Sequence, residues 1–360
     1  MIYLDYQATT PLAPEAREAM LAWLDGPGGT GFGNPHSAHR LGRMADAAVE
    51  RARAQVAALL PPGGRVIFTS GATEALNLAV KGLRPAVLAA SAIEHAAVLD
   101  CAEALQGRSE VHVIQVDAMG LVDPEAPLSA RLDLLAVMHV NNEIGTVQPI
   151  ERLARRVHER GGLLLCDAVQ SYGRLSLPGG VDLIAISAHK IHGPKGIGAL
   201  WVREGIELEP LIHGGGQEQA VRSGTLSPAL CAGFGAAAEL AGGRREDDER
   251  LVAALWTRAR ELFFGWTLNG DAEQRYFGNL NLRRDGLDVA RLMSDVREVM
   301  FSAGSACASG SGRPSHVLRA LGLSDAQAKS SIRLGFGRYT TLGELEQAAE
   351  WLNSAAAQQG

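Results

Sequence analysis

Six short apolar runs lie along residues 60–210, and helix-like segments separate them. The runs are RVIFTS, AVLAAS, LLAVMHV, GLLLCDA, DLIAIS and GALWV. Because each run is apolar at successive positions, both faces of the strand that it forms are expected to be buried. That pattern is typical of a parallel sheet covered by helices on both sides. It therefore predicts an α/β fold with a mostly parallel central sheet.

The pattern changes after the last of these strands. The stretch from Pro228 to about Phe264 is expected to be helical, with a break or loosening at Gly242–Gly243. Beyond it, extended pieces (FGNLNL, SIRLGFG) alternate with helical pieces (LDVARLMSDV, LGELEQAAEWL). We therefore expect a smaller α+β domain after the large α/β domain.

Composition excludes several classes of protein. The chain has 360 residues and a net charge of −6, so no general nucleic-acid-binding surface is indicated. Its N-terminus, MIYLDYQATT, does not resemble a secretory signal, and no apolar run is long enough to span a membrane. The four cysteines lie far apart without C-x-x-C or zinc-finger spacing, which favours reduced thiols in the cytoplasm and no structural metal site.

The most informative strand end is DLIAISAHKIHGPKGIG, residues 182–198. Here an apolar strand runs directly into Ser187, His189 and Lys190, and a glycine-rich turn follows. Ser187 and His189 suit a phosphate group, and a desolvated lysine suits imine chemistry. The competing interpretation is a lysine that simply extends into solvent.

Four further strand ends carry polar groups. Asp167 ends LLLCD, where a buried carboxylate needs a cation such as a protonated pyridine nitrogen, or else serves as a helix N-cap. In FTSGATEALNLAVKG a helix begins at Ala72–Thr73, and its free N–H groups could bind phosphate or simply be capped. His95 and Asn142 follow two more strands. Ligands of parallel sheets bind at this edge, so together these residues predict a phosphorylated pyridine aldehyde bound through an imine.

Cys307 lies in FSAGSACASGSG, a run of small residues. Three roles are open for it: a leftover surface thiol, a metal ligand, or a reactive group that must move. The wide spacing of the cysteines removes most support for a metal ligand. Small residues permit the travel that a reactive thiol would need.

Ten motifs together resemble one family. They are YLDYQATTP, SGATEALNLA, EHAAV, MHVNNEIGTVQPI, CDAVQSYG, SAHKIHGPKGIGAL, HGGGQEQAVRSGT, SAGSACAS, PSHVLRALG and SSIRLGFGRYT. In this order, from Tyr3 to about Thr341, they resemble the cysteine desulfurases of the NifS and IscS type, which are pyridoxal-phosphate enzymes of aminotransferase class V and fold type I. The serine-rich surroundings of Cys307 resemble the branch with a long catalytic loop.

The resemblance implies an architecture and a reaction. It implies a seven-stranded large domain over residues 15–245, which binds pyridoxal 5′-phosphate, and a small domain from residues 1–14 and 246–360. The reaction would convert L-cysteine to L-alanine and leave a persulfide on Cys307. A homodimer would pass this sulfur to an acceptor protein for iron–sulfur cluster assembly or tRNA thiolation, and a transient contact of Cys307 with an iron–sulfur cluster is left open.

The resemblance also implies a role for each site residue. Lys190 would bind the cofactor covalently and move the substrate α-proton, and His95 would stack on the ring and assist that transfer. Asp167 would hold the pyridine nitrogen. The remaining implied contacts are Gln170 to the phenolic oxygen, Asn142 beside the ring and substrate, Ala72, Thr73, Ser187 and His189 to the phosphate, Thr225 to the phosphate of the neighbouring subunit, and Arg333 to the substrate carboxylate.

Other activities remain to be distinguished. A selenocysteine lyase or another class V enzyme would use the same cofactor site, and a partner-binding protein could keep the fold without the chemistry. Two positions depart from the family pattern: Gln7 replaces a smaller residue, and His192 replaces a tyrosine. Many relatives extend further at the C-terminus, a region that often docks the scaffold protein, so the acceptor is left open.

Overall fold

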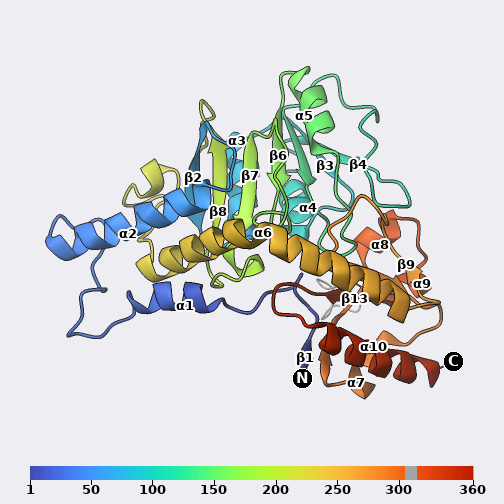
Figure 1. Ribbon diagram of the computed structural model, residues 1–360. Coiled ribbons are helices and arrows are strands. Elements are labelled where there is room, and N and C mark those ends of the chain that lie inside the picture. The colour runs from blue at the N-terminus through green and yellow to red at the C-terminus, as the bar shows by residue number, and fades with distance from the viewer. Residues whose placement is uncertain (305–313, 360) are drawn as a thin grey trace.

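The computed structural model describes residues 1–304 and 314–359 (Figure 1). Within them, seven strands form one sheet in the order β2-β8-β7-β6-β5-β3-β4. These strands are β2 (Gly64–Thr69), β3 (Val87–Ser91), β4 (Glu110–Ile114), β5 (Leu134–Met138), β6 (Leu163–Asp167), β7 (Leu183–Ser187) and β8 (Gly198–Arg203). Only β8 is antiparallel to its neighbours, β2 and β7. The prediction of a mostly parallel sheet is confirmed.

Helices cover both faces of this sheet. They are α1 (Pro14–Leu21), α2 (Arg40–Ala57), α3 (Ala72–Leu83), α4 (Ala96–Glu103), α5 (Ile150–His158) and α6 (Pro228–Leu262). Alternate strand residues point to opposite faces, so Phe68 and Ile186 pack with α1, α2, α5 and α6, whereas Ile67 and Ala185 pack with α3 and α4. In Figure 1, α2 and α6 cross in front of the strands.

Helix α6 is continuous through Gly242–Gly243, so the predicted break there is wrong. Two of its glycines, Gly235 and Gly242, lie close to α2 and to the chain that follows it. A Cβ at Gly235 would lie 2.8 Å from the Ala52 Cα, and one at Gly242 would lie 2.9 Å from the Leu59 Cδ2. The close approach of α2 thus explains the glycine at position 235, although glycine in a helix costs about 1 kcal/mol for each residue.

A second body lies beyond α6. It contains β1 (Ile2–Tyr3), β9 (Thr267–Leu268), β10 (Asn279–Arg283), β11 (Val299–Met300), β12 (Ser302–Ala303), β13 (Ser331–Gly335), α7 (Val289–Asp295), α8 (His316–Ala320), α9 (Asp325–Lys329) and α10 (Leu342–Ala357). The extended and helical pieces predicted after α6 are found as β10, β13, α7 and α10. Among the described residues, no helix is both long and apolar enough to cross a membrane.

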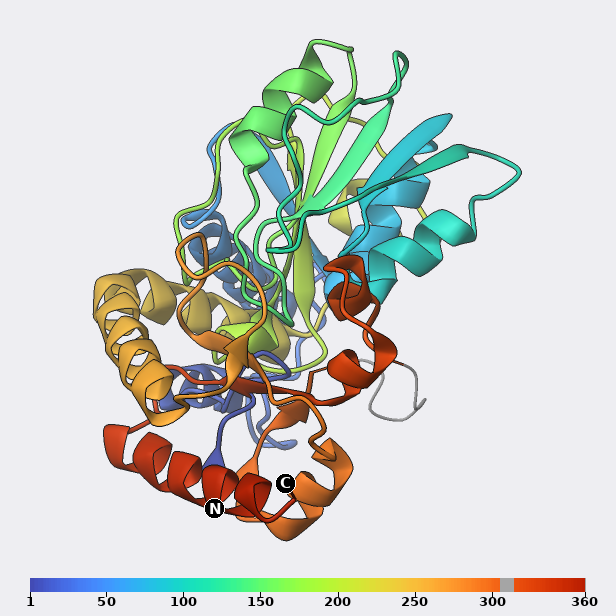
Figure 2. The ribbon, with the colours of Figure 1, turned by 90° about the vertical axis from the view of Figure 1, so that its right-hand side faces the viewer.

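The N-terminus belongs to this second body. Strand β1 pairs in parallel with β11, and the antiparallel sheet runs in the order β12-β13-β10-β9. Leu4 is buried with Leu280, Leu334 and Leu352 in one core. Figures 1 and 2 both show the N-terminus beside α10, although the whole large sheet separates them in sequence. The chain therefore reaches the large sheet by passing between the two bodies.

Gly198, the first residue of β8, packs closely against the turn before α3. A Cβ at Gly198 would lie 2.6 Å from the Ile186 oxygen and 2.7 Å from the Gly71 carbonyl carbon, both of them backbone atoms that cannot rotate away. We expect Gly198→Ala to lower the free energy of unfolding by about 1–3 kcal/mol, measured by urea denaturation. Gly343→Ala in α10 is the matched control, because no heavy atom lies within 4 Å of its Cβ position. A Gly198→Ala protein as stable as wild type would contradict this packing.

Candidate active site

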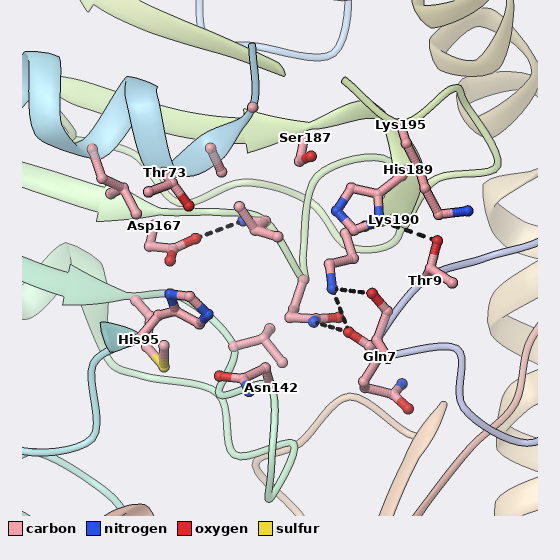
Figure 3. Close-up of a pocket in the computed structure, with 18 of the residues that line it drawn as sticks. Gln7, Thr9, Thr73, His95, Asn142, Asp167, Ser187, His189, Lys190 and Lys195 are labelled. Carbon is pink, nitrogen blue, oxygen red and sulfur yellow. Dashed lines mark hydrogen bonds between the residues drawn. The ribbon is translucent and has the colours of Figure 1, made fainter. Parts of the chain in front are cut away.

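The ends of five strands meet at one edge of the large sheet. Because only β8 is reversed, the carboxyl ends of β2, β3, β5, β6 and β7 lie at the same edge. A cavity of about 600 Å³ opens there, a volume suited to a cofactor. Of the predicted site residues, it is lined by Ala72, Thr73, His95, Asn142, Asp167, Gln170, Ser187, His189, Lys190 and Arg333. Figure 3 shows many of these side chains around the cavity.

Lys190 follows β7 in the short 3₁₀ turn Ala188–Lys190. Its ammonium donates hydrogen bonds to the main-chain oxygens of Gln7 at 2.5 Å and Ala8 at 2.8 Å (Figure 3). Both acceptors belong to the segment that enters from the second body. The lysine is half-buried in the cavity and does not simply extend into solvent, as the competing interpretation required.

Asp167 ends β6 with only 6% of its surface exposed. Its Oδ1 accepts a hydrogen bond from the Val169 N–H at 2.9 Å. Burial raises the pKa of this carboxyl, and the nearby His95 and Lys190 partly offset the rise. A buried carboxyl of this kind would gain from a cationic partner, because the pair would restore its charged form.

His95 begins α4 as its N-cap. Its Nδ1 accepts a hydrogen bond from the Ala97 N–H at 3.1 Å, so the neutral ring carries its proton on Nε2. Burial lowers the pKa of His95, which favours the neutral ring at pH 7. This cap therefore fixes both the orientation and the tautomer of an imidazole that faces the cavity.

One end of the cavity is rich in hydrogen-bond donors. Helix α3 begins there, and its N-cap, Gly71, has no side chain to accept from the first N–H groups. The Glu74 carboxylate reaches back only as far as the Ser70 N–H, at 2.8 Å. Thr73, Ser187, His189 and Lys195 line the same cavity. An anion fits this end, because helix N-termini and hydroxyl groups supply donors to it.

Arg333 occupies the side of the cavity formed by β13. Only 1% of it is exposed, and its Nη1 donates to the Asn142 oxygen at 3.0 Å. Its Nη2 donates to the Asp5 Oδ1 at 2.8 Å. Gln170 is also held, since its Nε2 donates to the Gln7 oxygen at 3.0 Å and its Oε1 accepts from Arg174. Hydrogen bonds within the protein therefore hold both the Arg333 guanidinium and the Gln170 amide in place.

Two further predicted site residues, Thr225 and Cys307, are not among the described lining of this cavity. Thr225 is exposed and does not line it, and Cys307 lies outside the described residues. Sequence reasoning assigned no role to several residues that do line it: Gln7, Ala8, Thr9, Ser70, Gly71 and Lys195. The YLDYQATTP motif was the signal for the first three, although neither periodicity nor composition indicates that this segment reaches the sheet.

Pyridoxal 5′-phosphate fits the residues present. The donor-rich end suits its phosphate, the buried Asp167 carboxyl suits a protonated pyridine nitrogen, and the Lys190 amine suits its aldehyde. The cavity has room for the ring between these groups. The fold and this cavity together define a pyridoxal-phosphate-dependent enzyme of fold type I.

Comparison with known proteins defines the family. The model of the aminotransferase class-V family matches residues 2–348, so the chain belongs to that family. It is 41% identical to a cysteine desulfurase IscS from Rickettsia felis, over 98% of this chain and 90% of the relative. A crystal structure of a NifS-like protein from Rickettsia africae has a TM-score of 0.88 and 29% identity, covering 99% of both chains. A structure described as SspA in complex with cysteine has a TM-score of 0.82 and 34% identity, covering 95% of this chain and 100% of that one.

His192, two residues after Lys190, is expected to make the stability of the folded protein depend on pH. It is buried with φ of 69°, and its Nδ1 donates to the Pro11 oxygen at 3.0 Å. Burial and the nearby Arg338 lower its pKa to about 3. The unfolded chain therefore binds a proton at His192 below about pH 6.5 that the folded protein does not. As the pH is lowered from about 6.5 towards 3, this group should therefore reduce the free energy of unfolding by up to about 1.4 kcal/mol for each pH unit.

His192→Asn removes the titrating group at a position where asparagine tolerates positive φ. We expect a shallower loss of stability between pH 6.5 and pH 5, measured by urea denaturation at several pH values. His36→Asn, at an exposed histidine, serves as the control and should keep the wild-type slope. An unchanged slope in His192→Asn would show that this histidine is not buried in its neutral form.

Proposed function

We propose that this chain is a cysteine desulfurase that removes sulfur from L-cysteine, releases L-alanine and keeps the sulfur as a persulfide on Cys307. The observation that carries the proposal is one cavity that unites a lysine, a buried carboxyl, an anion-binding end and a buried arginine. The family relationship and relatives named cysteine desulfurase support the same reaction. When bound, the cofactor supplies an electron sink for the substrate's α-carbon.

The residues of the chain then have distinct tasks. Lys190 would hold the cofactor and carry the proton to and from the substrate's α-carbon. His95 lies on the opposite side of the cavity from Lys190, and its fixed tautomer suits proton transfer. Asp167 stabilises positive charge at the ring nitrogen, and Gln170 contacts the phenolic oxygen. Arg333, with Asn142, binds the substrate carboxylate through its planar pair of donors. The phosphate is held by Ala72, Thr73, Ser187 and His189.

Cys307 completes the reaction as a nucleophile. Its thiolate attacks the sulfur of the substrate, forming a sulfur–sulfur bond as the substrate's carbon–sulfur bond breaks. The released electron pair remains on the β-carbon, which takes up a proton to give alanine. The other three cysteines are buried, and burial raises the pKa of each thiol. None of these three thiols has the properties of the nucleophile.

We propose a homodimer in which Thr225 joins the phosphate site of the neighbouring subunit. The turn Glu218–Ala220, with φ of 49°, 56° and 65°, precedes Thr225 and costs backbone strain. The buried Glu218 carboxylate offsets this cost, since it pairs with Arg53 at 2.7 Å and accepts from the Phe68 N–H at 2.8 Å. Such a turn suits a segment that must present Thr225 outward.

Sedimentation of the purified protein tests this proposal and should give twice the mass of one chain.

We place the enzyme in the cytoplasm, where its sulfur passes to an acceptor protein for iron–sulfur cluster assembly or tRNA thiolation. We also propose a division into residues 15–245 and residues 1–14 with 246–360, which the two main hydrophobic clusters support. The helix α6 runs across this boundary without a break. The two bodies are therefore expected to unfold together.

Cys307→Ala tests the reaction. Holoenzyme given L-cysteine should carry one extra sulfur on the peptide containing Cys307, with a matching amount of alanine, as seen by mass spectrometry after alkylation. The variant should lose both products while it retains the visible absorption of the bound cofactor, because Lys190 and the cavity are unchanged. Cys231→Ala is the control, since this buried thiol has no role in the reaction. Sulfide release at the wild-type rate from Cys307→Ala would refute the proposal.

A further inference from the structure

Arg174 is a half-buried side chain beside the cavity, and the proposed reaction gives it no role. It lies in the turn that follows β6, four residues after Gln170. Its Nη1 donates a hydrogen bond to the Gln170 Oε1 at 2.7 Å. Its Nη2 donates to the Lys190 oxygen at 2.5 Å and to the Tyr6 oxygen at 3.4 Å. One guanidinium therefore connects Gln170 with the main chain at Lys190 and with the N-terminal segment.

The direction of this guanidinium is fixed by its other contacts. The Arg174 Cζ lies 5.3 Å from the centre of the buried Tyr276 ring, a distance typical of a cation–π contact. A guanidinium is planar and rigid. Because the Tyr276 ring lies against it and the Lys190 oxygen holds Nη2, Nη1 can only point toward Gln170.

The Gln170 amide consequently has one orientation. Gln170 lines the cavity and is only 4% exposed. Arginine can only donate, so the amide oxygen must face Arg174, and a main-chain oxygen can only accept, so the amide nitrogen must face Gln7. An amide nitrogen carries two protons, and the Gln7 oxygen accepts only one of them. The amide therefore offers the cavity a donor and keeps its oxygen turned toward Arg174.

The positive charge of Arg174 is not neutralised by these contacts. Each hydrogen bond that it makes with the described residues goes to an uncharged oxygen. The Asp248 carboxylate lines the same small second cavity, but it pairs with Arg338 at 2.6 Å. A cation at the amide oxygen of Gln170 polarises the amide, so that its N–H groups become stronger donors. Such a donor suits an oxygen that carries negative charge.

We propose that Arg174 is a positioning residue, which holds the Gln170 amide so that its nitrogen donates to the phenolic oxygen of pyridoxal 5′-phosphate. The inference rests on the proposed function, in which Gln170 contacts that oxygen. Arg174 acts through Gln170 alone. Its effect on cofactor binding therefore depends on the presence of the phenolic oxygen, whereas a purely structural role would not.

A cofactor without this oxygen tests that dependence. Purified protein, freed of its cofactor, is given either pyridoxal 5′-phosphate or 3-deoxypyridoxal 5′-phosphate, and both dissociation constants are measured by equilibrium dialysis. Arg174→Met should weaken binding of pyridoxal 5′-phosphate about tenfold, the value of about one hydrogen bond to a charged acceptor. Binding of the 3-deoxy compound should stay within about twofold of wild type. Arg174→Lys, which keeps the charge and a donor, should bring the ratio of the two constants back to within about threefold of the wild-type ratio.

Further variants separate positioning from stability. Gln170→Met should weaken binding of pyridoxal 5′-phosphate as much as Arg174→Met does, and the double variant should lose no more than either single variant, because all three lose the same hydrogen bond. Arg338→Met is the matched control, since Arg338 lines the same small cavity but pairs with Asp248. Its loss should lower the free energy of unfolding and leave the ratio of the two dissociation constants unchanged.

Several results would overturn the inference: unchanged binding of pyridoxal 5′-phosphate in Arg174→Met, equal losses for the two compounds, additive losses in the double variant, or no recovery in Arg174→Lys. Arg174→Gln, whose side chain is too short to reach both Gln170 and Lys190, should show the same selective loss and replaces Arg174→Met if that variant does not fold. A wild-type protein that binds both compounds equally would refute the Gln170 contact and the inference with it. These measurements use no L-cysteine, so a failure to form alanine or persulfide would refute the proposed reaction alone.

Discussion

The direction of the strands determines where this protein can do chemistry. Six of the seven strands of the large sheet run the same way, and only β8 is reversed. The carboxyl ends of β2, β3, β5, β6 and β7 consequently lie at one edge, where chain turns can expose polar groups without breaking the ladder of hydrogen bonds. Residues from different strand ends, such as Thr73 and Lys190, which are about 120 positions apart, therefore line one cavity. Neither residue could reach the other through local structure alone.

Burying charged side chains at this edge of the sheet costs free energy, and the protein offsets this cost differently for Arg333 and for Lys190. Arg333 is neutralised by Asp5, whereas the Lys190 ammonium is held by the main-chain oxygens of Gln7 and Ala8. Burial raises the pKa of the Asp167 and Glu94 carboxyls, that of the fully buried Glu94 to about 8, and the nearby His95 and Lys190 partly offset the rise at Asp167. Glu94 accepts from Ser91 and the Met138 N–H and is a structural group. Asp167 faces the cavity, where a bound cation would complete its pairing.

The sequence predicted the parts of the site that depend on local pattern. Lys190 and Asp167 could be found because each follows a strand that is apolar on both faces, and a polar residue is conspicuous there. The N-terminal segment could not be found in this way, because Gln7 reaches the site through contacts with residues more than 150 positions away. A Cβ at Gly335 would lie 1.6 Å from the Gln7 Oε1, so this glycine provides space for the larger residue.

Helix α6 shows the opposite error. The Gly242–Gly243 pair favours a break when only backbone propensity is considered, yet the close approach of Leu59 to Gly242 explains a glycine inside an intact helix. Helix propensity depends on the local sequence alone, whereas the contact of Gly242 with Leu59, in the chain after α2, is a tertiary contact. The predicted role of Thr225 has a related limit, because its exposed side chain contributes nothing to the cavity of its own chain. A role for it requires a second subunit.

The two ends of the Cys307 segment are attached to the site on different sides. Before it, Ser302 contacts Asp5 and Arg333; after it, the buried Ser315 hydroxyl donates to the Glu143 carboxylate, and the His316 Nε2 donates to the Glu94 oxygen at 2.9 Å. Glu143 and Glu94 are the chain neighbours of Asn142 and His95. Ser302 precedes Cys307 by five residues in the sequence, and Ser315 follows it by eight. The described chain on both sides of residues 305–313 is therefore attached close to the cavity, to Asp5 and Arg333 on one side and to Glu143 and Glu94 on the other.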